Sequence, residues 1–329
     1  MARVGAARIF FDVVGTFQAS RLIKDSRSQA AVMSAIWLDT LGGMAEGIEQ
    51  IFQQVQETVD ESMESFFAYE NQLARVRKFY QGSPEEIDRF SAAALELGHA
   101  FAFTGEEALK ASARTAQLKQ ILGSQEAVIA GTEAGLMMAA VGEMETELGM
   151  NRLINLAQQT QMFMGGLEKA TYDKMTAEQQ AIIVTKATTH ALDQLNTVEN
   201  SSVATMEDIT FVLNQFASQA HIAGENIAEM SAKAALLLET GEEVSRAGTG
   251  LRMIYQRLGV ATGDAAQAVA EAVPEWDAAT VTTKSLTEVL EAIQPAYANM
   301  NSEQKRQFAI QIAGARHYIK FLKLMENHD

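Results

Sequence analysis

Residues 236–258 read LLLETGEEVSRAGTGLRMIYQRL, and this stretch decides the fold because it joins a helix end to a helix start. The leading leucines end one helix, and Gly241 follows where glycine adopts the left-handed conformation cheaply. The small residues 247–250 then open a second helix. Because Gly248 and Gly250 carry no side chain, we expect that helix to pack closely against the backbone of a neighbour.

A phosphate-binding loop is the alternative explanation for the glycines of SRAGTGLR, residues 245–252. The spacings GxxxxGK[ST] and GxGxxG are absent, and no strand pattern precedes the run. The stretch is therefore predicted to be a packing motif between two helices.

The composition extends the helical interpretation to the rest of the chain. Only three prolines occur in 329 residues, and residues 85–273 contain none. Alanine, glutamine, glutamate, leucine and methionine, which are good helix formers, fill this span. We predict an all-α fold, an elongated bundle of about eleven helices with short polar joints.

Helix boundaries follow from capping boxes, in which a Ser, Thr or Asn accepts from a backbone amide and a Glu or Gln three residues later reaches back. Boxes are predicted at Ser83/Glu86, Thr104/Glu107, Thr176/Gln179, Ser285/Glu288 and Asn301/Gln304, with a looser version at Thr205/Asp208. Helix ends are predicted at Gly98, Gly123, Gly149, Gly224, Gly241 and Gly314.

The N-terminal region has a different pattern. Residues 7–17 predict a short strand or extended arm, and residues 28–41 predict an alanine-rich helix. An apolar stripe at helical spacing over residues 43–80 predicts one long helix, in a bundle or a coiled coil with another copy. We expect three regions: an N-terminal arm and short helix (1–42), long helices with a Met-rich bundle (43–170), and a helical core (171–329).

Charge and residue types exclude several functions. The net charge of −16 opposes binding to a phosphate backbone, so sequence-specific nucleic-acid binding is not expected. The absence of cysteine excludes disulfides, thiolate metal sites and cysteine nucleophiles. Glu96 and His99 form one ExxH unit, but a di-iron bundle needs two. We therefore predict no catalytic residue, no cofactor and no metal site.

Membrane spans are not predicted either. The apolar run near the N-terminus is interrupted by Asp12, so it does not fit a secretory signal. Residues 127–142 are the most apolar candidate, but they are too short for a span and contain Glu133.

The block around Gly241 resembles a known family. Gly241 followed by AGTGLRMIYQRL is similar to the signature of phage tail tape measure proteins, a glycine and then A-G-T-x-L-R-x-x-x-x-x-L. Weaker similarity runs from about residue 61 to residue 325, with a departure at 274–285, where the family's glycine-containing loop is missing. The motif positions, to which a packing role is assigned, are Gly241, Ala247, Gly248, Thr249, Leu251, Arg252 and Leu258.

The resemblance implies a structural protein, not an enzyme, that occupies the tail tube lumen, sets tail length during assembly and leaves ahead of the DNA at ejection. Implied partners are copies of itself, as a trimer or a hexamer, the tail tube, tail tip or baseplate proteins, and tail assembly chaperones. It would be assembled in the bacterial cytoplasm and reside in the virion. A cytosolic helical scaffold or adaptor that binds partner helices is the alternative, and a helical-bundle enzyme with an unrecognised site is a third.

Overall fold

The computed structural model describes residues 67–80 and 82–327. The chain divides into two units, residues 1–66 and residues 67–329. The strand or arm expected at 7–17, the helix expected at 28–41 and most of the long helix expected at 43–80 lie outside the described residues. Residues 67–79 of that long helix are helical.

Every regular element in the described part of the chain is a helix, which confirms the all-α prediction. Sixteen helical segments lie between residues 84 and 326, more than the predicted eleven, because four segments of three or four residues occupy the expected joints. The segments are α4 Pro84–Ala100, α5 Gly105–Ala116, α6 Lys119–Leu122, α7 Gln125–Val141, α8 Thr146–Thr160, the 3₁₀ helix η1 Met162–Met164, α9 Lys169–Tyr172, α10 Ala177–Ser201, α11 Met206–Ile222, α12 Ile227–Glu239, α13 Val244–Leu258, α14 Asp264–Ala272, α15 Ala278–Val281, α16 Leu286–Ala298, α17 Ser302–Ala313 and α18 Tyr318–Glu326.

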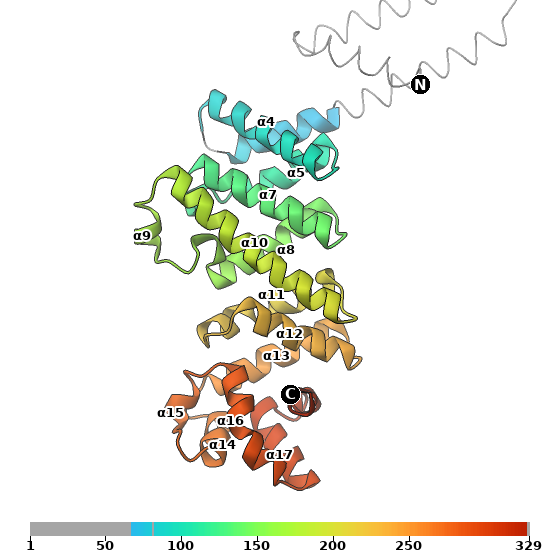
Figure 1. Cartoon of the computed structure of the whole chain (residues 1–329), viewed down its shortest axis with the longest axis vertical. Coiled ribbons are helices and arrows are strands. Elements are labelled where there is room, and N and C mark those ends of the chain that lie inside the picture. The colour runs from blue at the N-terminus through green and yellow to red at the C-terminus, as the bar shows by residue number, and fades with distance from the viewer. Residues whose placement is uncertain (1–66, 81, 328–329) are drawn as a thin grey trace, which may run out of the picture. The chain divides into compact units, whose positions relative to one another are not determined.

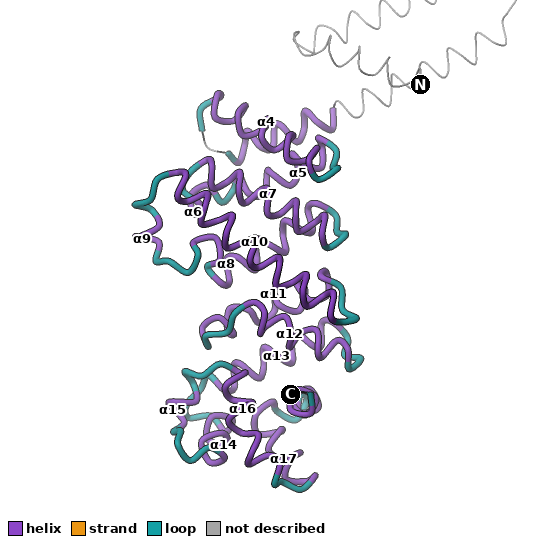
Figure 2. Tube along the Cα trace, in the orientation of Figure 1, coloured by secondary structure: helices purple, strands orange, loops and turns teal. Residues whose placement is uncertain are grey.

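Within the unit 67–329 the helices lie broadly in chain order from α4 to α17 (Figure 1), and several packed pairs join helices that are not consecutive. Helix α7 packs against α4, α5, α8 and α10, and α11 packs against α8, α12 and α13. Helix α13 also contacts α14 and α17, and α18 turns back from α17 onto α12 and α13. Figure 2 shows short loops between these helices, with wider excursions around α9 and α15. One apolar cluster runs through the layers from Val76 to Met325.

The predicted helix starts are confirmed. All five capping boxes form, and the Thr205 side chain accepts from the Asp208 amide without the reciprocal bond. A sixth box, Asn226 with Glu229 at the start of α12, was not predicted although its sequence signal is the same. Helix starts are therefore encoded locally, by residues three positions apart.

The prediction that six glycines end helices is correct for four of them and wrong for two. Gly123, Gly224, Gly241 and Gly314 have φ between 79° and 88° at or after helix ends. Gly98 and Gly149 lie inside α4 and α8 instead, so those two predictions are wrong. A Cβ on Gly98 would lie 2.5 Å from Ala108 Cβ, and one on Gly149 would lie 2.8 Å from Ala139 Cα. Because Gly98 and Gly149 have no side chain, the helices that contain them can pack closely against their neighbours.

The domain division expected near residue 170 stays a prediction. Helix α7 precedes this position and α10 follows it, yet the two pack against each other inside the unit 67–329. The methionine-rich stretch before it contributes to the core, since Met138 and Met150 are fully buried. Met150 occupies the space that Gly135 leaves open, where a Cβ would lie 2.2 Å from the Met150 methyl carbon.

Candidate functional site at the α12–α13 junction

The junction between α12 and α13 is a glycine-dependent turn. Gly241 has φ +82°, the left-handed conformation that glycine adopts most readily. Its N–H donates to Leu238 O at 2.9 Å, and the N–H of Glu242 donates to Leu237 O at 3.1 Å. This bond pair is the Schellman motif, which satisfies the last carbonyls of α12 and turns the chain back.

Helix α13 begins at Val244, three residues before the start predicted at Ala247. Its N-cap is Glu243, whose carboxylate accepts from the amides of Ser245 (3.1 Å) and Arg246 (3.2 Å). A carboxylate at this position balances the positive end of the helix dipole. The inward face carries the motif residues Ala247, Gly248, Leu251 and Leu258, all of them buried.

Gly248 and Gly250 lie close to side chains of neighbouring helices. The prediction was that they would lie close to the backbone of a neighbouring helix, and it is wrong at both positions. A Cβ on Gly248 would lie 2.6 Å from Gln215 Cδ of α11, and one on Gly250 would lie 2.1 Å from Lys320 Cδ of α18. The neighbouring Thr249 donates its hydroxyl to Gln215 Oε1 at 3.2 Å. The two glycines therefore receive long polar side chains from two different helices.

Glu242 connects this turn to the C-terminal helix. Its carboxylate pairs with Lys320 and Lys323 of α18, each at 3.1 Å, and Lys323 also donates to Thr240 O at 3.0 Å. Burial acts to raise the pKa of Glu242, but hydrogen bonds from the two lysines outweigh it and hold the pKa below its ordinary value. The lysines thus fasten α18 across the start of α13.

A buried polar network lies behind α13. Glu225, in the turn between α11 and α12, pairs with Lys233 at 3.0 Å, and its side chain is 0% exposed. The same carboxylate accepts from the Tyr255 hydroxyl (2.5 Å) and from the Thr287 amide (3.1 Å). Burial, followed by the charge of Glu225, raises the pKa of Tyr255 well above its ordinary value. Sequence reasoning missed this network, which fixes α12, α13 and α16 relative to one another.

The three arginines of α13 make different contacts, and Arg246 pairs with Glu243 at 3.9 Å. Arg257 donates from Nε to Ile312 O at 3.1 Å and from a terminal nitrogen to Gln311 O at 2.8 Å, so it caps the last turn of α17. The motif residue Arg252 is exposed, and it makes no hydrogen bond or ion pair with any residue that the structure describes. Packing within this unit therefore does not explain Arg252.

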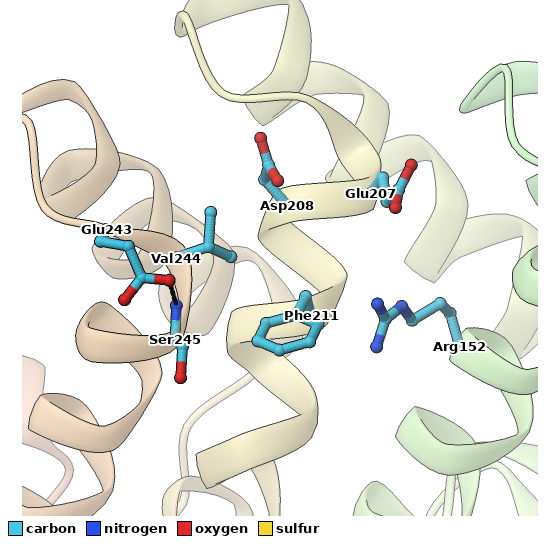
Figure 3. A pocket seen from close by; sticks show the side chains of 7 residues that line it. All are labelled: Arg152, Glu207, Asp208, Phe211, Glu243, Val244 and Ser245. Carbon is cyan, nitrogen blue, oxygen red and sulfur yellow. Dashed lines mark hydrogen bonds between the residues drawn. The ribbon is translucent and has the colours of Figure 1, made fainter.

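A shallow hollow of about 210 Å³ lies at the N-terminal end of α13, where α8, α11 and α13 meet. Phe211 lies between Arg152 on one side and the start of α13 on the other (Figure 3). The guanidinium of Arg152 lies 4.7 Å from the centre of the Phe211 ring. The lining residues are Arg152, Glu207, Asp208, Phe211, Glu243, Val244 and Ser245.

The lining of the hollow contains more acidic than basic side chains. Arg152 Nε is buried without a hydrogen-bond partner, and desolvation lowers the pKa of this guanidinium against the raising effect of Glu207 and Asp208. Neither of those two carboxylates forms an ion pair or a hydrogen bond within the described part of the chain. Glu243 lies on the other side of Phe211 from Arg152 (Figure 3), and its carboxylate pairs with Arg246 at 3.9 Å.

Within the described residues no group of three His, Cys, Asp or Glu side chains is placed to hold a metal ion. Glu96 and His99 lie near the end of α4, where no second ExxH unit joins them. No single described helix is long and apolar enough to cross a membrane, and only the pair α7 and α8, bent by 119°, meets the length and composition criteria.

Comparison with protein families decides the class of protein. The family model described as "phage-related minor tail protein" matches residues 91–314, which include the α12–α13 junction and most of the described helices. The chain belongs to this family. The minor tail protein is therefore a structural component of a phage tail and part of the virion. No curated protein and no solved structure was found to match the chain.

Proposed function

We propose that this minor tail protein is a tape measure protein, which occupies the tail tube lumen, sets tail length during assembly and leaves ahead of the DNA. The observation that carries the proposal is the position of the Gly241–Leu258 motif. The stretch similar to the tape measure signature lies inside the region matched by the minor tail family and forms the junction on which α11, α17 and α18 pack.

Two further features support this role. The unit 67–329 contains 21 basic residues (26 − 5) and 33 acidic residues (42 − 9), so it repels the DNA that must pass after it. The apolar stripe at 43–66 fits a helix that associates with other copies, which a symmetric tube would require. The proposed partners are therefore other copies, as a trimer or a hexamer, the tail tube and tip or baseplate proteins, and the assembly chaperones.

The test is the tail of a phage that lacks this gene, viewed by electron microscopy. A tape measure protein is required for tails of defined length, so we expect tails to be absent or of scattered length and to be restored by the gene in trans. A second variant inserts 21 helix-forming residues into the 43–66 stretch. At 1.5 Å per residue the insertion should lengthen the tail by about 30 Å.

Tails of normal, uniform length without the gene would overturn the proposal. Unchanged length with the insertion, in a protein that still enters particles, would also contradict the length-setting role while leaving a tail-tip role intact. We propose no enzymatic function, because the residues at the α12–α13 junction pack against one another and form ion pairs.

A further inference from the structure

The helices from α7 to α13 form two layers that differ in charge. Helices α7, α10 and α12 pack side by side in one layer, and α8, α11 and α13 pack side by side in the other. The first layer contains seven carboxylates and two lysines, of which Lys233 is buried. In the second layer the carboxylates lie within the first three residues of α8 and α11, and α13 contains none. Negative charge is therefore concentrated in the first layer.

Beyond those first turns the second layer combines arginines with uncharged polar side chains. Residues 148–160, 209–222 and 244–258 contain four arginines and no carboxylate, although acidic residues outnumber basic ones by 33 to 21 in the unit 67–329. The side chains opposite the buried stripes of the three helices are exposed or half-buried, and we call this surface the amide face. It includes Asn155, Gln158, Gln215, Ser218, Thr249 and Gln256.

The outward side of the first layer has the opposite character. Glu133, Asp193 and Glu239 lie opposite the buried stripes of α7, α10 and α12, and none of the three forms an ion pair within the described part of the chain. Small exposed side chains, Ala140 and Ala232, lie on the same side. We call this surface the carboxylate face. Its small side chains leave room for long carboxamide and guanidinium groups, which donate hydrogen bonds to carboxylates.

We propose that copies of this chain associate in a ring in which the amide face of one copy packs on the carboxylate face of the next. Both halves of this contact are present in one chain, and their charges are complementary. A contact between two different faces is heterologous, and repeated about one axis it closes into a ring of copies. The inference rests on the proposed function for the symmetric ring in the tail, and it adds which surfaces of neighbouring copies meet.

Two single-cysteine variants of the full-length protein test which faces meet, because the chain has no cysteine of its own. N155C labels the amide face and T189C labels the carboxylate face, and both positions are exposed. The reagent is a bismaleimide that spans about 10 Å, the distance between the axes of packed helices. We expect covalent dimers when the two variants are mixed. Neither variant alone should give dimers, because a heterologous contact does not place a face against the same face of another copy.

Charge changes of nearly constant shape test the chemistry of the contact. In the N155C chain, Q158E with Q256E places two carboxylates on the amide face and should lower the rate of mixed cross-linking about tenfold. The matched control, Q120E with Q267E, changes two exposed glutamines outside both faces and should leave the rate unchanged. In the T189C chain, E133K with D193K should restore the rate of the Q158E/Q256E chain. Circular dichroism verifies that each variant is folded.

Equal dimer yields from the mixture and from either variant alone would overturn the proposal. An equal loss of rate in the Q158E/Q256E chain and in its control, or no recovery with E133K and D193K, would also overturn it. The proposed function fails separately. Absence of mixed dimers, in a protein whose 21-residue insertion still lengthens tails, would reject only this contact. Normal tails without the gene would reject the tape measure role, whatever the cross-linking shows.

Discussion

Replacement of Glu225 by glutamine should remove much of the stability of the C-terminal half of the unit. The side chains of Glu225 and Lys233 are 0% and 8% exposed, and removal of one partner from a buried ion pair costs about 3–5 kcal/mol. Lys233 keeps hydrogen bonds to Thr287 Oγ1 (2.6 Å) and Glu229 O (3.3 Å). The amide oxygen can still accept from the Thr287 amide. We therefore expect the lower end, a loss of about 3 kcal/mol.

The assay is urea unfolding followed by tryptophan fluorescence. Trp276 is the only tryptophan of the unit 67–329 and lies between α14 and α15, so in a W37F background its signal reports on the region that Thr287 anchors. The control is D173N, which breaks the exposed Lys169–Asp173 pair and should cost no more than about 0.5 kcal/mol. A loss in E225Q no larger than in D173N would refute the reasoning.

Three other substitutions test the packing and the ion pairs. Gly248→Leu, whose Cβ would lie 2.6 Å from Gln215 Cδ, should lower the free energy of unfolding by about 1–3 kcal/mol and impair tail assembly without removing any catalytic activity, as measured by denaturation and electron microscopy. Gly149→Ala should lower the melting temperature, since its contact with the Ala139 backbone outweighs a gain in helix propensity of about 1 kcal/mol. Glu242 has a lowered folded-state pKa, so its contribution is complete above the ordinary value of 4.5 and is lost as the pH falls through the folded-state pKa. Glu242→Gln should therefore flatten the decline in melting temperature between pH 5 and pH 3, and an unchanged decline would contradict the assignment.

The sequence could predict what neighbouring residues determine. Helix starts were predicted correctly because a capping box is complete within four residues, as at Ser83 and Glu86. The turn at Gly241 was predictable for the same reason. Gly149 was misassigned because a glycine ends a helix in one setting and admits a neighbour in another, and only its distance to Ala139 tells the two apart.

The Glu225 network shows the other limit of prediction. Its partners Tyr255 and Thr287 lie 30 and 62 residues away in the chain. No spacing rule relates residues so far apart in the chain. The sequence of the turn that contains Glu225 also does not distinguish a buried glutamate from a solvent-exposed one. The hollow has the same origin, since Arg152, Phe211 and Glu243 come from three helices that meet only in the folded unit.

The stretch similar to the tape measure signature contains residues whose role in packing the structure explains and one, Arg252, whose role it does not explain. Gly241 makes the turn, Gly248 receives Gln215, and Ala247, Leu251 and Leu258 fill the core. Each of these positions is accounted for inside one copy of the chain. Arg252 is exposed on the same helix and makes no hydrogen bond or ion pair with a described residue. The fold of a single copy therefore explains why these five positions carry glycine or apolar residues, and it sets no such requirement at Arg252.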